Sequence, residues 1–215
     1  MRYHNVGDLP ERLPVFPLSG VLLLPRGNLP LNIFEPRYLA MVDAAMSGNR
    51  LIGMIQPSEP EEKVLKPALS PVGCAGRITS YRETDDGHYH ITLTGVCRFR
   101  IAEEIAASTP FRNVKADFSP YIDDLAGNDQ SDFPRDRLIA ALKDYLSHRD
   151  LNADWSSVLS APAETLVNAL AMLCPFAPAE KQALLEAANW QDRVDTLVAL
   201  LEISGAPASG GNTLN

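Results

Sequence analysis

The stretch that decides the fold runs from Gly73 to Ile101 and reads GCAGRITSYRETDDGHYHITLTGVCRFRI. In its second half apolar and polar residues alternate, which is typical of a half-buried antiparallel strand. The apolar face consists of Tyr89, Ile91, Leu93, Cys97, Phe99 and Ile101, with Gly95 as the only interruption. Before this strand, Asp86-Gly87 has the composition of a type I′ turn. We therefore expect a hairpin in which Gly73–Thr84 pairs with the strand that begins at Tyr89.

The sequence on either side of the hairpin predicts further strands and one helix. The expected strands are Leu13–Leu18, Leu29–Phe34, Leu51–Gln56 and Asn113–Tyr121. The first of them is short and contains prolines, as edge strands do. Between Pro36 and Gly48 apolar residues recur with the period of a helix. The proline-rich segment 57–71 predicts a surface loop.

From residue 132 onward the apolar residues recur with helical spacing, in four successive stretches. Each stretch is apolar on one side only, so these helices must pack on one another or on the sheet. Asn189 has the side chain of an N-cap for the last of them. The sequence therefore predicts an α+β protein with a strand-rich part at 11–122, a helical part at 132–204 and a disordered tail at 205–215.

The chain has 215 residues and a formal net charge of −8, and this charge is unevenly placed. Residues 1–116 carry 13 Lys and Arg against 12 Asp and Glu, whereas residues 117–215 carry 6 against 15. Because nucleic-acid binding needs a basic face, this distribution disfavours it. The N-terminus lacks the apolar core of a signal peptide, and no apolar run approaches the roughly 20 residues that span a bilayer. Three widely spaced cysteines argue against a disulfide framework, so we expect a cytoplasmic protein.

Residue patterns that carry chemistry are weak in this sequence. A Gly-rich loop ending in Gly-Lys-Ser/Thr is missing, which argues against nucleotide hydrolysis. His88 and His90 have no nearby third ligand for a zinc site, and no serine lies in a nucleophile elbow. Cys97 is on the apolar strand face, and Asp123-Asp124 lies in a polar loop where we expect solvated carboxylates. The sequence therefore predicts no catalytic residue, no metal and no cofactor.

Several separated motifs resemble, in the same order, the N-terminal substrate-binding domain of Lon proteases. They are Leu13–Leu18, Leu22–Pro25, Leu29–Leu39, Gly73–Ile78, Gly95–Ile101 and Pro178–Glu186. The most specific piece is Phe34-Glu35-Pro36-Arg37-Tyr38. The resemblance covers nearly the whole chain, about residues 11 to 203.

The resemblance implies a PUA-like β-barrel of about six strands with an inserted helix, followed by a C-terminal helical bundle. It also implies a non-catalytic module that recognises unfolded or degron-bearing polypeptides or a protein partner, as an adaptor or regulator of protein turnover. The sequence contains neither the ATPase nor the Ser–Lys protease element of Lon. We therefore expect no enzymatic activity.

The segment Val21–Leu31 is the candidate polypeptide-binding site. Its prolines and glycine interrupt regular pairing, so its leucines can line an apolar groove. The candidate side chains are Leu22, Leu23, Leu24, Leu29 and Leu31. The alternative is that these leucines close one end of the barrel.

The motif Phe34, Glu35, Pro36, Arg37 and Tyr38 is expected to be structural. Glu35 would complement the N-terminus of the helix, and Arg37 would tie the helix to the barrel.

A second candidate function is nucleic-acid binding, RNA included, through the barrel. Arg77, Arg82, Arg98 and Arg100 would then form a basic strip on the hairpin. The overall acidity weighs against this function. A small-molecule hydrolase with an unrecognised site is a third possibility.

Overall fold

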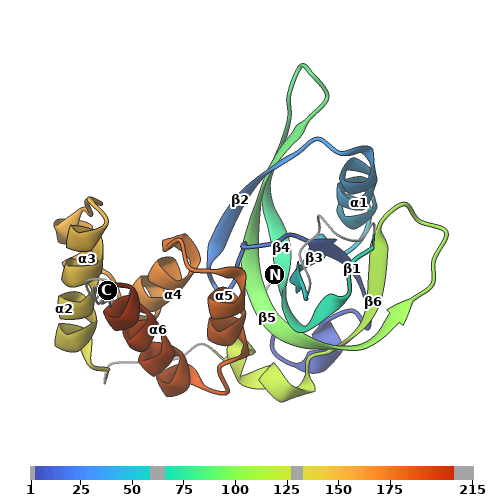
Figure 1. The fold of residues 1–215 in the computed structure, drawn as a ribbon. Coiled ribbons are helices and arrows are strands. Elements are labelled where there is room, and N and C mark those ends of the chain that lie inside the picture. The colour runs from blue at the N-terminus through green and yellow to red at the C-terminus, as the bar shows by residue number, and fades with distance from the viewer. Residues whose placement is uncertain (1–2, 59–65, 127–132, 206–215) are drawn as a thin grey trace, which may run out of the picture. The chain divides into compact units, whose positions relative to one another are not determined.

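The structure is a computed structural model that describes residues 3–58, 66–126 and 133–205. The predicted tail at 205–215 lies, apart from its first residue, outside the described residues. The chain forms two compact units: a strand unit, residues 1–128 and 177–186, and a helical unit, residues 129–176 and 187–215. In this division residues 177–186 group with the strands, whereas the sequence placed them in the helical part at 132–204. Both units are drawn in Figure 1.

The strand unit contains one six-stranded sheet. Its strands are β1 (Arg12–Pro17), β2 (Asn28–Ile33), β3 (Leu51–Pro57), β4 (Leu69–Glu83), β5 (Tyr89–Ile105) and β6 (Arg112–Asp117). Their order is β2-β5-β4-β3-β1-β6, and β5 also pairs with β6. The strands β5, β4, β3, β1 and β6 thus form a closed ring of pairings, because the first half of β5 binds β2 and its second half binds β6.

The predicted edge strand near Leu13 is an interior strand. β1 pairs with β6 on one side and with β3 on the other, and the two pairings share only Val15. Pro14 falls in the half that binds β6, and Pro17 in the half that binds β3. Each half of the strand therefore has one partner, which is why two prolines are tolerated in the ring.

The predicted hairpin is confirmed, but its turn is not of type I′. The Gly87 N–H donates to the carbonyl of Thr84, and the Thr84 N–H donates to the carbonyl of His88. Within the turn Gly87 has a positive φ of 78°, and Asp85 and Asp86 do not. This geometry is the three-residue connection in which a turn is followed by a left-handed glycine. A type I′ turn needs a positive φ at both of its central residues, and Asp86 has a negative φ. The Asp-Gly pair is therefore not the central pair of a type I′ turn, and the predicted turn type is wrong.

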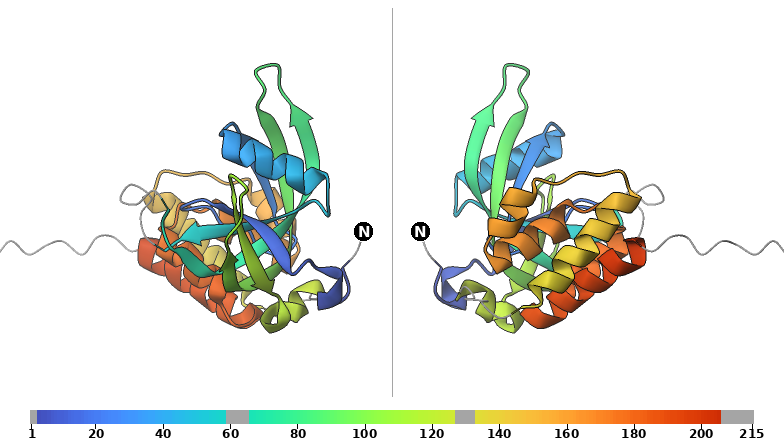
Figure 2. Two further views of the ribbon diagram at one scale, coloured as in Figure 1. Left: turned by 90° about the vertical axis from the view of Figure 1, so that its right-hand side faces the viewer. Right: turned by 90° about the vertical axis from the view of Figure 1, so that its left-hand side faces the viewer.

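Helix α1 (Pro36–Met46) is inserted between β2 and β3, as predicted. It buries the apolar residues Tyr38, Met41, Val42 and Ala45. β3 is buried along its whole length, in agreement with its continuous apolar sequence. Figure 2 shows α1 beside the outer part of the β4–β5 hairpin, whose tip projects beyond the helix.

Helix α5 (Pro178–Glu186) belongs to the strand unit because polar side chains fix it to the sheet. The buried amide of Gln56 donates to the carbonyl of Pro178 at 3.0 Å and to Gln182 Oε1 at 3.1 Å. Lys181 Nζ donates to the carbonyl of Gly20 at 2.9 Å. The spacing of apolar residues does not reveal these polar contacts. The sequence therefore predicted that α5 belongs with the other helices.

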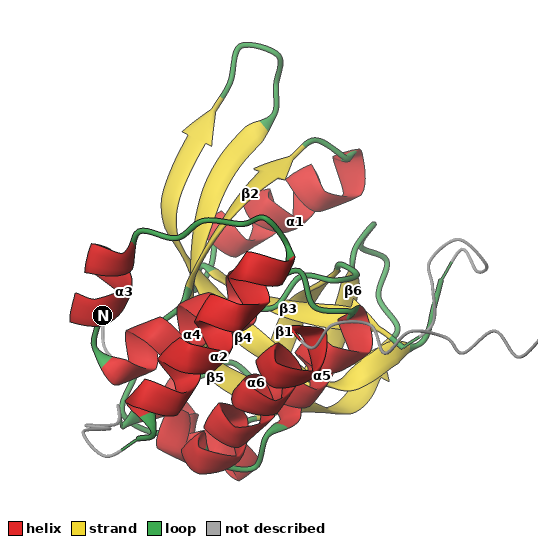
Figure 3. Ribbon diagram, turned by 60° about the vertical axis from the view of Figure 1, so that its left-hand side comes forward, coloured by secondary structure: helices red, strands yellow, loops and turns green. Residues whose placement is uncertain are grey.

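The helical unit contains α2 (Arg135–His148), α3 (Trp155–Ser160), α4 (Ala163–Leu173) and α6 (Trp190–Gly205), of which α3 was not predicted. Figure 3 shows α2 and α6 packed side by side. The predicted N-cap is confirmed: Asn189 Oδ1 accepts the Asp192 N–H at 2.9 Å. Within the described ranges, no helix combines the length and apolar character that crossing a bilayer requires.

Candidate functional site

Three of the five candidate leucines belong to the core. Leu22, Leu23 and Leu24 are exposed by 2%, 1% and 0%. Leu23 packs so closely on β4 that a Cβ atom at Gly76 would lie 2.6 Å from its side chain. The expectation of a groove lined by these three side chains is therefore corrected: the structure buries them inside the strand unit.

Leu29 and Leu31 are only partly buried and lie on β2. Leu31 is opposite Ile91 of β5, which in turn is opposite Tyr81 of β4, so the three side chains share one face of the sheet. Tyr81 is 38% exposed, and its ring lies 5.1 Å from that of Tyr89. We call Leu29, Leu31, Tyr81 and Tyr89 the hairpin face. Tyr81 and Tyr89 belong to the β4–β5 hairpin, whose projecting tip is visible in Figure 2.

Tyr89, at the end of this face where β5 begins, remains a neutral phenol. Burial, and next a hydrogen bond with Asp43 of α1, raise the pKa of Tyr89 above its usual value. Its neutral ring and the adjacent ring of Tyr81 offer apolar contact together with a hydroxyl group, a combination that is frequent in binding surfaces.

The backbone edge of β2 is poorly suited to pair with another strand. The Gly95 N–H donates to the carbonyl of Gly27. Because the register between β2 and β5 is unbroken from there, the main-chain N–H and C=O groups of Leu29 and Leu31 also point toward β5. The backbone of Pro30 therefore lies on the outer edge, where its missing N–H weakens strand addition. A ligand of this region would contact the side chains of the hairpin face instead of extending the sheet.

The motif from Phe34 to Tyr38 connects β2 to α1. Arg37 pairs with Glu35 at 2.9 Å and stacks on the Tyr38 ring, with 4.5 Å between the guanidinium carbon and the ring centroid. The Tyr38 ring lies 4.2 Å from that of Phe16 in β1. Half of the Arg37 side chain is exposed. Tyr38, and not Arg37, thus anchors the helix to the sheet, which corrects the expected role of Arg37.

Arg37 and Tyr38 also line a pocket in the strand unit with a volume of about 830 Å³. We call it the rim pocket. Its other lining residues are Pro17, Lys66, Pro67, Glu104, Ile105, Ala106, Ala107, Thr109, Pro110, Phe111 and Arg112. Sequence reasoning missed this pocket, because its walls come from four segments that are far apart in the chain.

The polar side of the rim pocket is an ionic cluster around Glu104. Arg112 donates to both carboxylate oxygens, at 3.0 and 2.7 Å, and Lys66 Nζ lies 2.8 Å from Oε1. Hydrogen bonds from Arg112, and then from Lys66, lower the pKa of Glu104 to about 2. The carboxylate therefore remains charged and holds both cations at the pocket wall.

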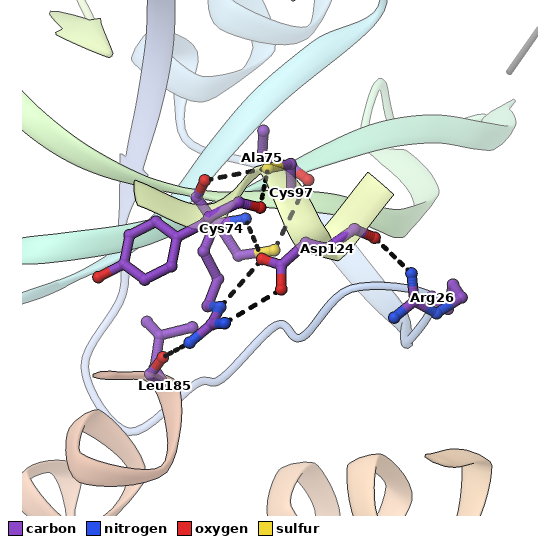
Figure 4. Close-up of polar contacts among 8 residues, drawn as sticks. Arg26, Cys74, Ala75, Cys97, Asp124 and Leu185 are labelled. Atoms are coloured by element: carbon purple, nitrogen blue, oxygen red, sulfur yellow. Dashed lines mark hydrogen bonds and ion pairs between the residues drawn. The ribbon is translucent and has the colours of Figure 1, made fainter. Parts of the chain in front are cut away.

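The predicted arginine strip is interrupted, because Arg98 is buried. Its guanidinium donates to both carboxylate oxygens of Asp124, at 2.9 and 3.1 Å, and to the carbonyl of Leu185 in α5 at 3.0 Å. Figure 4 shows this cluster, and the ring of Tyr121 lies 4.4 Å from the guanidinium carbon. Asp124 is correspondingly buried, which corrects the expectation of a solvated carboxylate.

The thiol and hydroxyl groups that could carry chemistry are either buried or bound to a neighbouring side chain. Burial, first, and the nearby Asp124 raise the pKa of the Cys97 thiol to about 12, so it stays protonated. Ser156 and Ser157 donate to the Asp154 carboxylate, which caps α3. Among the described residues, no group of three or more His, Cys, Asp or Glu side chains could hold a metal ion.

A ring of paired strands with an inserted helix, accompanied by a separate helical unit, is an α+β architecture that occurs in solved Lon N-terminal domains. The structure resembles the Lon N-terminal domain protein from Xanthomonas campestris, with a TM-score of 0.59 and 22% identity over 88% of this chain and 96% of that one. It also resembles the N-terminal domain of the Mycobacterium avium complex Lon protease, with a TM-score of 0.61 and 15% identity over 90% of this chain and 97% of that one.

The sequence model of the ATP-dependent protease La (LON) substrate-binding domain matches residues 12–202, and the chain belongs to this family. Lon protease of Desulfosudis oleivorans is 37% identical over 94 residues, which are 43% of this chain and 12% of that protein. Lon protease 2 of Thermus thermophilus is 24% identical over 208 residues, which are 90% of this chain and 24% of that protein. The chain thus spans a quarter or less of the length of these relatives.

Proposed function

We propose that this chain is a non-catalytic polypeptide-binding module that acts as an adaptor or regulator of protein turnover. The observation that carries the proposal is the match of residues 12–202 to a domain family described as substrate-binding in an ATP-dependent protease. In such a module the binding energy comes from contacts with the bound chain, and hydrolysis belongs to other domains.

The hairpin face supports this proposal because it offers apolar surface without a fixed sequence requirement. Leu29, Leu31 and Tyr81 lie on one face of the sheet. Unfolded chains expose apolar side chains, and burying them against such a face is favourable at about 25 cal/mol for each Å². Phe34, 58% exposed, adds a further apolar side chain next to the hairpin, 5.9 Å from the ring of His88.

The test uses a reduced, carboxymethylated protein that is permanently unfolded and carries a fluorescent label. We expect the chain to bind this probe in fluorescence anisotropy, and Tyr81→Ser and Leu31→Ser to weaken binding about tenfold each. ATP hydrolysis and cleavage of the probe, followed in the same samples, should both be undetectable.

The matched control is Leu173→Ser, which removes a leucine that is 80% exposed on α4 of the helical unit. This control should leave the affinity unchanged. Absence of binding by the native chain would contradict polypeptide binding altogether. Loss of binding in the control, with the hairpin variants unaffected, would move the binding surface to the helical unit.

A further inference from the structure

The rim pocket has the size and position of a second binding site in the strand unit. Its volume of about 830 Å³ lies in the range of pockets that hold small ligands or one end of a larger one. The pocket is formed where β1 ends, where α1 begins and where β5 connects to β6. None of the four residues of the hairpin face lines it.

The ionic cluster of this pocket carries a positive charge that its own carboxylate does not neutralise. Arg112 and Lys66 share the single carboxylate of Glu104. Each of the three nitrogen atoms of the Arg112 guanidinium has an acceptor, because Nη1 donates to the carbonyl of Pro67 at 2.7 Å while Nε and Nη2 bind Glu104. Lys66 is different: its side chain is 66% exposed, and an ammonium group has three N–H donors. Lys66 can therefore donate to a ligand without leaving Glu104.

The beginning of α1 adds hydrogen-bond donors to the lining of the pocket. Pro36 and Arg37 are the first two residues of this 11-residue helix, whose N-terminus carries a partial positive charge. Arg37 keeps donors for a ligand, because only Nε and Nη2 contact Glu35 and half of the side chain is exposed. An anion in the pocket would thus lie among cationic groups from two separate segments.

Apart from Thr109, the other side chains that line the pocket are apolar. Tyr38, Ile105 and Phe111 are among them, and Pro17 and Pro110 add rigid surface. A ligand that uses the whole pocket must therefore combine an anionic group with an adjoining apolar group. A polypeptide presents this combination at its C-terminus, where the main-chain carboxylate is next to the last side chain.

We propose that the rim pocket binds the C-terminal end of a polypeptide, with the carboxylate at Lys66 and Arg37 and an apolar last side chain against Tyr38 and Phe111. This inference rests on the proposed polypeptide binding and adds a recognised chain end to it. The motif Arg37-Tyr38 then contributes to the binding site as well as to the fold. The local positive charge contrasts with the net charge of −8 of the whole chain, which makes the pocket selective for an anion that also fits its shape.

The experiment compares two short peptides of one sequence, labelled at the N-terminus and ending in Leu-Phe, one with a free carboxylate and one with a C-terminal amide. We expect the free acid to bind about tenfold more tightly, because charge-assisted hydrogen bonds are lost in the amide. Lys66→Gln and Arg37→Gln should each reduce this preference. Arg82→Gln, the matched control at an exposed arginine of β4, should preserve it.

Equal affinities for the acid and the amide would overturn the inference. N-acetyl-phenylalanine serves as a competitor: if it binds as tightly as the peptide acid, the pocket takes a small organic acid and the polypeptide end is excluded. Binding of the unfolded protein probe is measured in the same series. If that probe binds while acid and amide do not differ, only the rim-pocket inference fails; if neither the probe nor the peptides bind, the proposed function fails too.

Discussion

Arg98 holds three parts of the strand unit together. It lies on β5, its carboxylate partner Asp124 lies in the 3-10 segment Ser119–Leu125, and its third contact is the carbonyl of Leu185 in α5. The Arg98 and Asp124 side chains are only 6% and 9% exposed. Removing these two charges from water costs free energy, which offsets much of their attraction. The pair therefore affects stability chiefly when one partner is removed and the other stays buried.

Arg98→Met is therefore expected to lower the free energy of unfolding by about 3–5 kcal/mol, because Asp124 stays buried without its counter-ion. Urea denaturation followed by circular dichroism measures this change. Arg82→Met at an exposed position should stay within about 0.5 kcal/mol. The double variant Arg98→Met/Asp124→Leu should regain part of the loss. A cost below about 1 kcal/mol for Arg98→Met would show that Asp124 finds water instead.

Glu104 makes stability depend on pH in the acid range. Its pKa is lowered to about 2 in the folded chain, so its contribution is complete above the unfolded value of about 4.3 and is lost as the pH falls toward 2. Because the side chain is one-third exposed, solvent screens the effect to about 1 kcal/mol. Glu104→Gln should therefore destabilise the chain at about pH 7, and the difference from the native chain should shrink toward pH 2. A pH-independent difference in urea denaturation would argue against this ionic role.

Single residues also show what the sequence can and cannot reveal. Alternation correctly placed Ile91, Leu93 and Phe99 inside, since period two is a property of the strand itself. The same alternation placed Arg98 outside, and its burial could not be foreseen, because the segments that cover it are distant in sequence. Leu29 and Leu31 lie on β2 and are partly exposed, whereas Leu22 to Leu24 precede that strand and are buried. The composition of the segment does not distinguish the two groups.

At the scale of elements, β5 depends on a glycine where another segment crosses it. The Arg26 N–H donates to the Gly95 carbonyl, and the Gly95 N–H donates to that of Gly27. A Cβ atom at Gly95 would overlap the carbonyl oxygen of Leu24, which is backbone and cannot rotate away. This close approach explains why the apolar row of the strand is interrupted at that point.

Gly95→Ala is consequently expected to cost about 3 kcal/mol of unfolding free energy, as overpacking does where the backbone must move. Thermal and urea denaturation measure it. The control is Gly48→Ala at the end of α1, where a Cβ atom would lie 3.6 Å from the Ala44 carbonyl oxygen, an ordinary contact. The control should change stability by less than about 0.5 kcal/mol. Equal effects in the two variants would refute the crossing argument.

Most elements were predictable because their patterns are local. The hairpin, α1, β3 and the cap of α6 follow from residues within one segment. The errors concern pairing and packing: β1 has two partners, and α5 joins the sheet through Gln56 and Gln182. Long-range contacts determine which elements pair or pack together. The residue types within one segment do not predict these partners.

At the scale of the whole molecule, the placement of charge limits what the strand unit can bind. Residues 1–116 carry 13 basic against 12 acidic side chains. Of the four hairpin arginines, Arg98 is buried with Asp124, and Arg77 donates to the Tyr3 hydroxyl and the Asn49 carbonyl. Only Arg82 and Arg100 are exposed, too few to neutralise several phosphates.

Binding of the unfolded probe should therefore respond weakly to salt. Burial of apolar surface on the hairpin face releases no counter-ions, so the dissociation constant should change by less than about threefold between roughly 50 and 500 mM salt. Binding to phosphates would behave differently, because the logarithm of affinity falls by about 0.7 to 0.9 per neutralised phosphate for each tenfold rise in salt. Anisotropy titrations of the probe and of a single-stranded oligonucleotide over this range separate the two cases. Tight oligonucleotide binding with a steep salt slope would favour the nucleic-acid function, and Arg82→Gln together with Arg100→Gln would then have to reduce that slope by about two.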